Sequence, residues 1–337
     1  MSGPGRKILV TGANGFIGSN LCAHFIRRGR KVYGLVRRTA DLHFLRGLEV
    51  ELFFGDLGEP AGFRIPDEIE EVVHAASVVS DLAGEAVCRR QIYGLARNLV
   101  GRIRADGIRL RRFVYISTAI VLGYRRLNIS PERPGIPADF MPYVRSKKRT
   151  EAYFLDEYAG RGFPVVILRP SDVYGPNDRT SCLPILKGMD AGKFPYVGHG
   201  RWRFPLCDVS NLCQAVELSL EIPGIEGRAY TVANGIAPTW REFFGGLLQE
   251  LDRKPSATVP VPVAMGLGFL AETAHRLLPR LDPVISRYRI RRITTHTTFD
   301  ISRTMAELGY RPDDRLDRQI KAIVAWFRKE QQAGYVR

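Results

Sequence analysis

A tyrosine and a lysine four residues apart are the first candidates for chemistry in this chain of 337 residues. Tyr143 and Lys147 enclose the run Tyr-Val-Arg-Ser-Lys, which opens a segment expected to be helical to about Tyr158. Residues at i and i+4 lie on one face of a helix. A lysine ammonium beside a phenol favours the phenolate, so we expect Lys147 to lower the pKa of Tyr143 from about 10. Tyr143 could then exchange a proton with a carbonyl or an alcohol.

A hydroxyl residue ends a predicted strand upstream of this pair. Arg112 to Ser117 has the pattern of a buried parallel strand, and Thr118 follows it. From there Thr118 could hold the same substrate oxygen as Tyr143. Because a tyrosine and a lysine at this spacing also occur on ordinary protein surfaces, the prediction depends on the elements that precede them.

The N-terminal segment predicts a dinucleotide-binding turn. Lys7 to Val10 is expected to be a buried strand, and residues 19–29 are expected to form a helix. Three glycines in GxxGxxG spacing lie between them: Gly12 permits a tight turn, Gly15 admits a pyrophosphate, and Gly18 lets the helix pack closely. The helix N-terminus offers free N–H groups to the phosphates. The expected cofactor contacts of this turn are Gly12, Asn14, Gly15, Phe16, Ile17 and Gly18.

The end of the next strand bears on which nicotinamide cofactor binds. NAD sites usually place an acidic residue there to take the ribose hydroxyls. The strand Lys31 to Val36 ends without one, and Arg37 and Arg38 follow it. Since a guanidinium suits a 2′-phosphate, we expect Arg37 and Arg38 to bind NADP, with NAD as the second candidate. An ordinary surface arginine after a strand is the alternative.

Two further strand ends are expected at the same edge of the sheet. Val50 to Phe54 leads into Asp56-Leu57, and Asp56 could hydrogen-bond the adenine ring. Glu71 to His74 leads into Ala75-Ala76, whose small side chains leave room for the cofactor. Both pairs are therefore expected cofactor contacts.

Taken in this order, the motifs resemble the extended short-chain dehydrogenase/reductases, the NAD-dependent epimerase/dehydratase family. The resemblance rests on the pieces described above and on further ones that extend it over nearly the whole chain. These further pieces are His74-Ala-Ala76, Gly123 after Ser117-Thr118, Leu168-Arg-Pro-Ser-Asp-Val-Tyr-Gly-Pro176, Leu308-Gly-Tyr-Arg-Pro312 and Trp326-Phe327. Jointly they are specific for the family, but they do not fix the substrate.

The resemblance implies an α/β fold. A Rossmann doubly wound parallel sheet would occupy residues 1–175, and a smaller C-terminal domain, mainly substrate-binding, would occupy 176–337. Segments around 204–233 would return to the Rossmann sheet. A homodimer would pair the helices expected at about 85–106 and 143–158.

The resemblance also implies roles for single residues. Thr118, Tyr143 and Lys147 match the family's catalytic trio, and Lys147 would also reach the nicotinamide ribose. Pro170 and Gln91 are further expected cofactor contacts. Gln91 stands where the family often has an asparagine, so its reach differs.

Two nucleotide-sugar branches are disfavoured by residues at diagnostic positions. Dehydratases of the family carry Asp-Glu directly after the catalytic threonine, where this chain has Ala119-Ile120. Epimerases carry an arginine that holds the substrate phosphate, where alignment places Phe204-Pro-Leu206. Arg201 or Arg203 could substitute from nearby, so an epimerase stays an alternative.

The C-terminal third resembles the sterol-dehydrogenase-like branch instead. The pieces that match are Tyr230-Thr-Val-Ala-Asn234, Thr239-Trp-Arg-Glu-Phe-Phe244, Pro260-Val-Pro262, an apolar helix ending near Glu272, and Phe299-Asp-Ile-Ser302 ahead of Leu308-Gly-Tyr310.

The apolar segment 263–278 has three interpretations. It could cap an apolar pocket, or it could touch a membrane surface together with Arg276, Arg280 and the arginines of 287–292. Ordinary core is the favoured interpretation, because methionine and leucine at helical spacing are usually buried. The side chains concerned are Met265, Leu267, Phe269, Leu270, Leu277 and Leu278.

Composition limits the other classes of function. The formal charge of +15 suggests nucleic acid, an acidic membrane surface or an anionic ligand as partner. The arginines are scattered and accompany no nucleic-acid-binding motif, so we expect no nucleic-acid partner. Five scattered cysteines without a CxxC pair predict neither a disulfide framework nor a metal site. We expect a cytoplasmic protein, since no signal-peptide pattern precedes the first strand.

The sequence therefore predicts an enzyme that transfers a hydride between NADP(H) and a secondary alcohol or ketone. The small-molecule substrate would be bulky and mainly apolar, either sterol-like or ketoacyl. Tyr143 would exchange the proton, Thr118 would orient the oxygen, and Lys147 would tune Tyr143 and hold the ribose. The alternatives are a nucleotide-sugar 4-epimerase or reductase with the same trio, and a non-catalytic cofactor-binding protein, which the intact trio disfavours.

Overall fold

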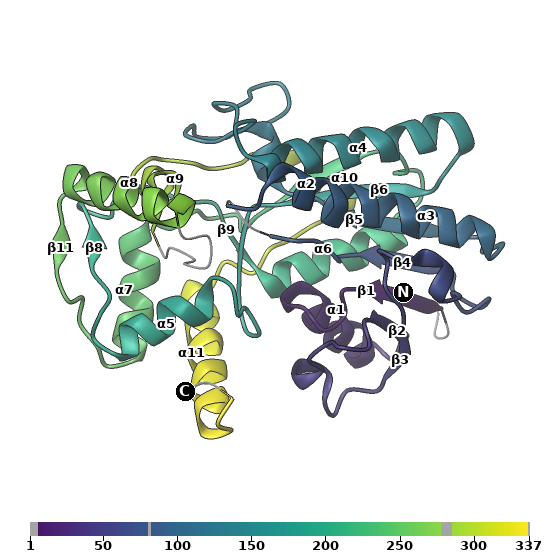
Figure 1. The fold of residues 1–337 in the computed structure, drawn as a ribbon, viewed down its shortest axis with the longest axis horizontal. Helices are drawn as coiled ribbons and strands as arrows, with labels where there is room; N and C mark the ends of the chain where they lie inside the picture. The colour runs from purple at the N-terminus through teal and green to yellow at the C-terminus, as the bar shows by residue number, and fades with distance from the viewer. Residues whose placement is uncertain (1–5, 80–81, 278–284, 336–337) are drawn as a thin grey trace.

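A seven-stranded parallel sheet forms the centre of the protein (Figure 1). The computed structural model describes residues 6–79, 82–277 and 285–335. Along the sheet the strand order is β10-β6-β5-β4-β1-β2-β3, and every neighbouring pair is parallel. The chain reverses its direction of travel between β1 and β4, as in a doubly wound Rossmann sheet, which confirms the predicted fold class. The strands are β1 (Lys7–Thr11), β2 (Lys31–Val36), β3 (Val50–Phe54), β4 (Glu71–His74), β5 (Arg112–Ile116), β6 (Val165–Pro170) and β10 (Ala229–Val232).

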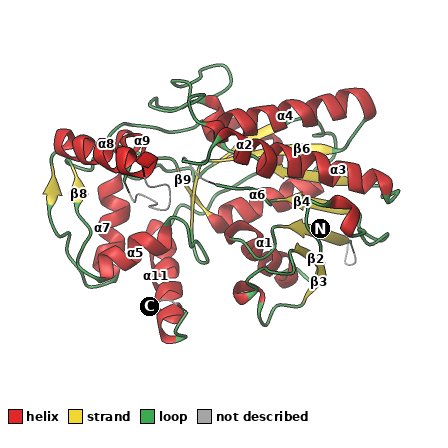
Figure 2. Ribbon diagram, viewed as in Figure 1, coloured by secondary structure: helices red, strands yellow, loops and turns green. Residues whose placement is uncertain are grey.

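Helices cover both faces of this sheet (Figure 2). The inner strands are nearly continuous apolar runs because neither face meets water; every residue of β4 and β5 is buried. One face carries α1 (Phe16–Arg27), α6 (Val209–Glu221) and α10 (Ser302–Leu308). The other carries α3 (Leu95–Ala105) and α4 (Pro142–Arg161).

A second group of elements lies beyond the carboxyl ends of the strands, on the left of Figure 1. Its core joins rings of Phe204, Trp240, Phe243 and Phe327. A short parallel pair, β7 and β9, leads from the sheet toward this group. The elements are β7 (Asp172–Tyr174), α5 (Cys182–Asp190), β8 (Tyr196–Val197), β9 (Leu206–Asp208), α7 (Trp240–Glu250), β11 (Thr258–Val259), α8 (Val261–Leu277), α9 (Arg287–Ile293) and α11 (Leu316–Gln332).

Several helices differ from their predicted bounds: α4 ends at Arg161 rather than near 158, and α8 ends at Leu277 rather than near Glu272. Helix α1 begins at Phe16 rather than at 19, because Gly15 adopts an extended conformation and caps it directly. The helix expected over 85–106 is divided into α2 (Glu85–Cys88), the π-helical turn η3 (Arg89–Gly94) and α3. Single π turns occur often at functional sites. The remaining short turns are η1 (His43–Leu45), η2 (Pro60–Gly62) and η4 (Ala119–Leu122).

Candidate active site

The glycine turn at the carboxyl end of β1 leaves no room for side chains. Gly12 has a φ of +67°, and a Cβ there would lie 2.9 Å from Cα of Ala76. A Cβ on Gly18 would lie 2.1 Å from the carbonyl oxygen of Gly12. Gly15 N donates to that same oxygen over 2.9 Å. Since Gly15 caps α1 without a side-chain hydrogen bond, the first N–H groups of α1 stay available to an anionic ligand.

A buried hydrogen-bond cluster holds Ala76 against this turn. Thr11 Oγ1 accepts from the backbone N–H of Ala76 over 3.3 Å and lies 2.8 Å from His74 Nδ1. Burial and, secondarily, the charge of Lys147 lower the pKa of His74 to about 3, so the imidazole is neutral. Ala75 and Ala76 are both partly exposed beside the turn. Thr11 and His74 support the turn; the sequence singles out His74 only as part of a motif and predicts this role for neither residue.

The start of α1 is tied to the segment that follows β7. Asn20 Nδ2 donates to the carbonyl oxygens of Phe16 and Pro176, each over 2.9 Å. Asn177 Nδ2 donates to Ser19 Oγ over 3.1 Å. These bonds fix the orientation of the first turn of α1, which contains Phe16, Ile17 and Gly18.

The ends of β2 and β3 present exposed polar side chains. Val36 is buried at the end of β2, and Arg37 and Arg38 are both exposed directly after it. The Arg38 guanidinium lies 5.9 Å from the Phe54 ring centroid. Asp56 is exposed, and its Oδ1 accepts from the backbone N–H of Gly58 over 2.7 Å.

The other residues predicted to bind a cofactor lie in several elements around the turn. Leu57 is buried, and Asn14 Nδ2 donates to the carbonyl oxygen of Asp41 over 3.3 Å. Gln91 is partly buried in the π-helical turn η3, which packs against α4. Pro170 is buried at the end of β6.

Tyr143, Lys147 and Thr118 come together where β5 ends and α4 begins. Pro142 starts α4 at a position where its missing N–H costs no hydrogen bond, so Tyr143 lies in the first turn. Lys147 is 2% exposed, and its Nζ donates to the Ile116 carbonyl oxygen over 2.8 Å. Nζ also lies 5.8 Å from the Tyr143 ring centroid. Thr118 is close enough to hydrogen-bond Tyr143.

Burial dominates the acidity of Tyr143. It raises the pKa of Tyr143 to about 12, while the Thr118 hydrogen bond and the charge of Arg292 act in the opposite direction. The prediction that Lys147 lowers the pKa of Tyr143 below its ordinary value is therefore wrong when only the groups of the protein are considered. Desolvation outweighs the attraction to nearby cations, and burial also lowers the pKa of Lys147 to about 7.

A buried carboxylate lies one helical turn beyond Lys147. Glu151 is 6% exposed and accepts from Ser117 Oγ over 2.5 Å. Arg169 holds it through two nitrogens, with Nη2 at 2.6 Å from Oε2 and Nε at 3.1 Å from Oε1. The charge of Glu151 raises the pKa of Lys147 against the effect of burial. The spacing of eight residues from Tyr143 places Glu151 on the same helix face, a signal present in the sequence.

An arginine from the C-terminal region faces Tyr143 from α9. Arg292 Nε donates to Asp172 Oδ2 over 3.0 Å, and Nη2 forms a second contact with that carboxylate. Its Nη1 donates to the Tyr288 hydroxyl over 2.8 Å. Tyr288 and Tyr143 pack against one apolar cluster, so α9 lies beside the start of α4. No local sequence signal connects α9 with α4.

The position of the epimerase phosphate clamp is occupied by hydrophobic core. Phe204 is 1% exposed and stacks on Trp240 with ring centroids 4.0 Å apart. Arg201 and Arg203 are exposed nearby, and Arg203 Nη1 donates to the Ala237 carbonyl oxygen over 2.9 Å. Neither arginine is among the groups that affect Tyr143.

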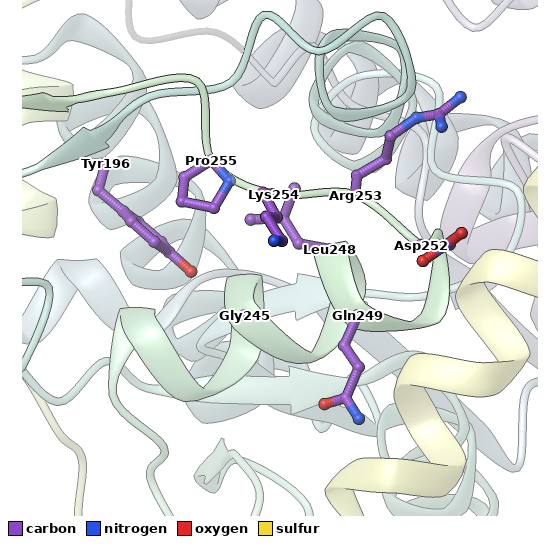
Figure 3. A pocket seen from close by; sticks show the side chains of 8 residues that line it. All are labelled: Tyr196, Gly245, Leu248, Gln249, Asp252, Arg253, Lys254 and Pro255. Atoms are coloured by element: carbon purple, nitrogen blue, oxygen red, sulfur yellow. The ribbon is translucent and has the colours of Figure 1, made fainter.

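A surface hollow of about 320 Å³ lies apart from these residues, in the C-terminal region (Figure 3). Its lining includes Tyr196, Leu248 and Lys254, and it contains none of the predicted site residues. Within the described parts of the chain, no cluster of three or more potential metal ligands occurs. No helix there is long and apolar enough to cross a bilayer. All five cysteines are buried thiols.

Known proteins resemble the chain in sequence and in fold. The family model described as NAD dependent epimerase/dehydratase matches residues 8–233. Sterol demethylase protein B of Methylococcus capsulatus is 31% identical, covering 95% of this chain and 98% of that protein. The 4-hydroxy-2-methyl-3-oxo-4-farnesyl-3,4-dihydroquinoline-1-oxide ketoreductase of Stigmatella aurantiaca is 26% identical, covering 90% and 91%. A UDP-glucuronic acid 4-epimerase from Bacillus cereus, solved with UDP-glucuronic acid and NAD, shares the fold with a TM-score of 0.72 at 20% identity, covering 96% and 99%.

Replacing Glu151 by glutamine tests the electrostatic support of Lys147. The substitution keeps the size of the side chain and removes its charge. Because that charge raises the pKa of Lys147, the lysine of the variant should lose its proton at lower pH. We expect the alkaline decline of kcat to begin at lower pH than in the wild type, as measured in a rate–pH profile.

Glu157→Gln is the matched control. Glu157 lies on the same helix, is also buried and forms an ion pair with Arg104. It should cost stability without moving the profile. Equal displacement of the profile in both variants, or in neither, would contradict the role of Glu151.

Proposed function

The chain belongs to the NAD-dependent epimerase/dehydratase family, and from this premise we propose that it interconverts a secondary alcohol and a ketone with NADP(H). It is an NAD(P)-dependent enzyme of the extended short-chain dehydrogenase/reductase type. The observation that carries the proposal is the meeting of Thr118, Tyr143 and Lys147 at the edge of the sheet that also holds the glycine turn.

The residues around Tyr143 suit proton transfer to a carbonyl oxygen. When bound, the reduced nicotinamide supplies the hydride. With a pKa of about 12, Tyr143 is protonated at neutral pH and can donate its proton as the oxygen gains charge. Thr118 donates a second hydrogen bond to the same oxygen. Lys147, anchored by the Ile116 carbonyl and supported by Glu151, stabilises the phenolate that remains.

The proposed substrate is bulky and mainly apolar, sterol-like or ketoacyl. Phe204 and Trp240 form core where a nucleotide sugar would need a phosphate clamp. Arg292, the cation beside Tyr143, is engaged by Asp172 and Tyr288. The relatives point the same way: one is named for sterols, and the named substrate of the other carries a ketone and a farnesyl chain. These observations favour an apolar ketone over a nucleotide sugar.

NADP is the proposed cofactor. The end of β2 offers no carboxylate to the ribose hydroxyls, since Val36 is apolar and buried there. Arg37 and Arg38 are exposed beside it, and neither forms an ion pair with an acidic residue in the described part of the chain. Two adjacent guanidinium groups suit a 2′-phosphate.

The proposed assembly is a homodimer built on α3 and α4, as the family resemblance implies. Exposed apolar side chains occur on this side of the molecule: Val87 of α2 is 40% exposed, and Leu155 and Tyr158 of α4 are 37% and 41% exposed. Their burial against a second copy would remove apolar surface from water.

Replacing Tyr143 by phenylalanine removes the proposed proton donor while keeping the ring. We expect the rate of NADPH-dependent reduction of 3-ketosteroids to fall by about 10²–10⁴-fold. NADPH affinity, measured by fluorescence titration, should stay near that of the wild type. Tyr153→Phe, on the same helix but away from Thr118, is the control and should keep its rate. Wild-type turnover by Tyr143→Phe would refute the assignment.

Replacing Arg37 by alanine tests the cofactor preference. A hydrogen bond to a charged group contributes about 1.5–3 kcal/mol, so we expect Kd for NADPH to rise about tenfold to a hundredfold. Kd for NADH should stay almost unchanged, because NADH lacks the 2′-phosphate. Equal wild-type affinities for the two cofactors, unaffected by the substitution, would overturn the NADP assignment.

A further inference from the structure

Helix α8 presents its large apolar side chains to solvent. Val263, Leu267, Leu270 and Leu277 are 53%, 47%, 63% and 77% exposed, and their spacing places them along one face of the helix. Phe269 beside them is 50% exposed. The prediction that this segment is ordinary core is therefore wrong for these residues. Leu278 and Arg280 lie outside the described residues, as does the side chain of Arg276.

The opposite face of α8 is made of small residues that allow close packing. Ala264 is 5% exposed, and a Cβ on Gly268 would lie 2.8 Å from Ile290 Cδ1 of α9. Because α9 occupies this face, α8 cannot turn its leucines inward without losing that packing. A surface helix normally has the reverse arrangement, with large apolar residues inside and polar residues outside.

The surroundings of this apolar stripe are cationic. Residues 261–271 contain no charged side chain, and α9 carries four arginines in seven residues with no acidic residue. The guanidinium of Arg287 lies 5.0 Å from the Phe269 ring centroid and pairs with Glu272. Arg291 is exposed. An apolar stripe with Arg287 at its edge and the exposed Arg291 on the neighbouring helix is complementary to a bilayer with anionic headgroups.

We propose that α8 and α9 form a membrane-docking surface, in which the apolar stripe enters the headgroup boundary of an anionic bilayer and the arginines contact its phosphates. Charge argues against a second copy of this chain as the occupant. Two such surfaces would bring two copies of the exposed Arg291 together, on chains that each carry a formal charge of +15.

The position of this surface gives it a role in substrate access. α9 joins it to the catalytic centre, since Tyr288 of α9 packs on the same apolar cluster as Tyr143. A substrate that partitions into the bilayer would thus leave it close to the site. This delivery role rests on the proposed function, whereas the docking itself does not depend on any activity.

Vesicle flotation tests the docking without a substrate. The full-length protein is mixed with vesicles of phosphatidylglycerol and phosphatidylcholine in equal parts, and with vesicles of phosphatidylcholine alone. We expect the protein to float with the anionic vesicles. Its binding to the neutral vesicles should be weaker by about tenfold or more. Leu267→Gln with Leu270→Gln should reduce binding to the anionic vesicles at least about tenfold. Arg291→Gln should reduce it less and only on anionic vesicles.

The matched control replaces exposed apolar residues elsewhere. Ile236 and Met305 are 62% and 43% exposed, and Ile236→Gln with Met305→Gln should leave flotation at the wild-type level. Because every replaced side chain is largely exposed, we expect all variants to unfold at the wild-type temperature. An equal unfolding temperature shows that the variants are folded.

Three flotation results would overturn the proposal: no flotation of the wild type, unchanged flotation of the α8 variant, or equal loss in the control variant. Light scattering without vesicles tests the alternative that a second copy of this chain covers the stripe. If the α8 substitutions convert a wild-type oligomer into monomers, the stripe is an interface between copies and the membrane proposal is wrong.

Discussion

The proposed chemistry depends on keeping one lysine charged in a place where water cannot reach it. Lys147 is almost fully buried beneath Tyr143, and burial alone would drive its proton off. Three neighbouring elements oppose this. β5 supplies the Ile116 carbonyl, and Ser117 follows it; α4 supplies Glu151, and β6 supplies Arg169 to hold Glu151 in place. The central sheet therefore does more than support the site from a distance, because its strand ends and the facing helix supply the polar and charged groups around Lys147.

The ends of the neighbouring strands β1 and β4 shape the glycine turn. Gly12 and Ala76 approach so closely that the turn accepts no side chain, and Thr11 with neutral His74 fixes that approach from below. Lys147 contributes to keeping His74 neutral, which connects the two halves of the site electrostatically. Near Tyr143, the Asp172–Arg292 pair joins β7 to α9 and brings a cation toward the phenol. The site is thus assembled from both ends of the chain.

Local patterns in the sequence predicted the fold well and the environment of the site poorly. The strands 31–36, 50–54 and 71–74 have the predicted bounds, because short segments rich in apolar residues and ended by turn residues are typical of strands in a parallel sheet. Three features carry no such signal. Apolar periodicity locates α8 but does not say which face is buried, and the contact of α9 with the site is purely tertiary. The acidity of Tyr143 was mispredicted because a charged neighbour can be read from spacing, whereas desolvation cannot.

The fate of the hydride is the most direct test that this centre carries out net oxidation and reduction of an apolar ketone. NADPH deuterated at both C4 positions is incubated with the protein and a series of 3-ketosteroids and branched 3-oxo compounds, and the products are analysed by mass spectrometry and NMR. We predict one deuterium at the new carbinol carbon for each NADP⁺ formed. Absence of label from every product, together with interconversion of UDP-sugars at C4 without net oxidation of the cofactor, would contradict the proposed function.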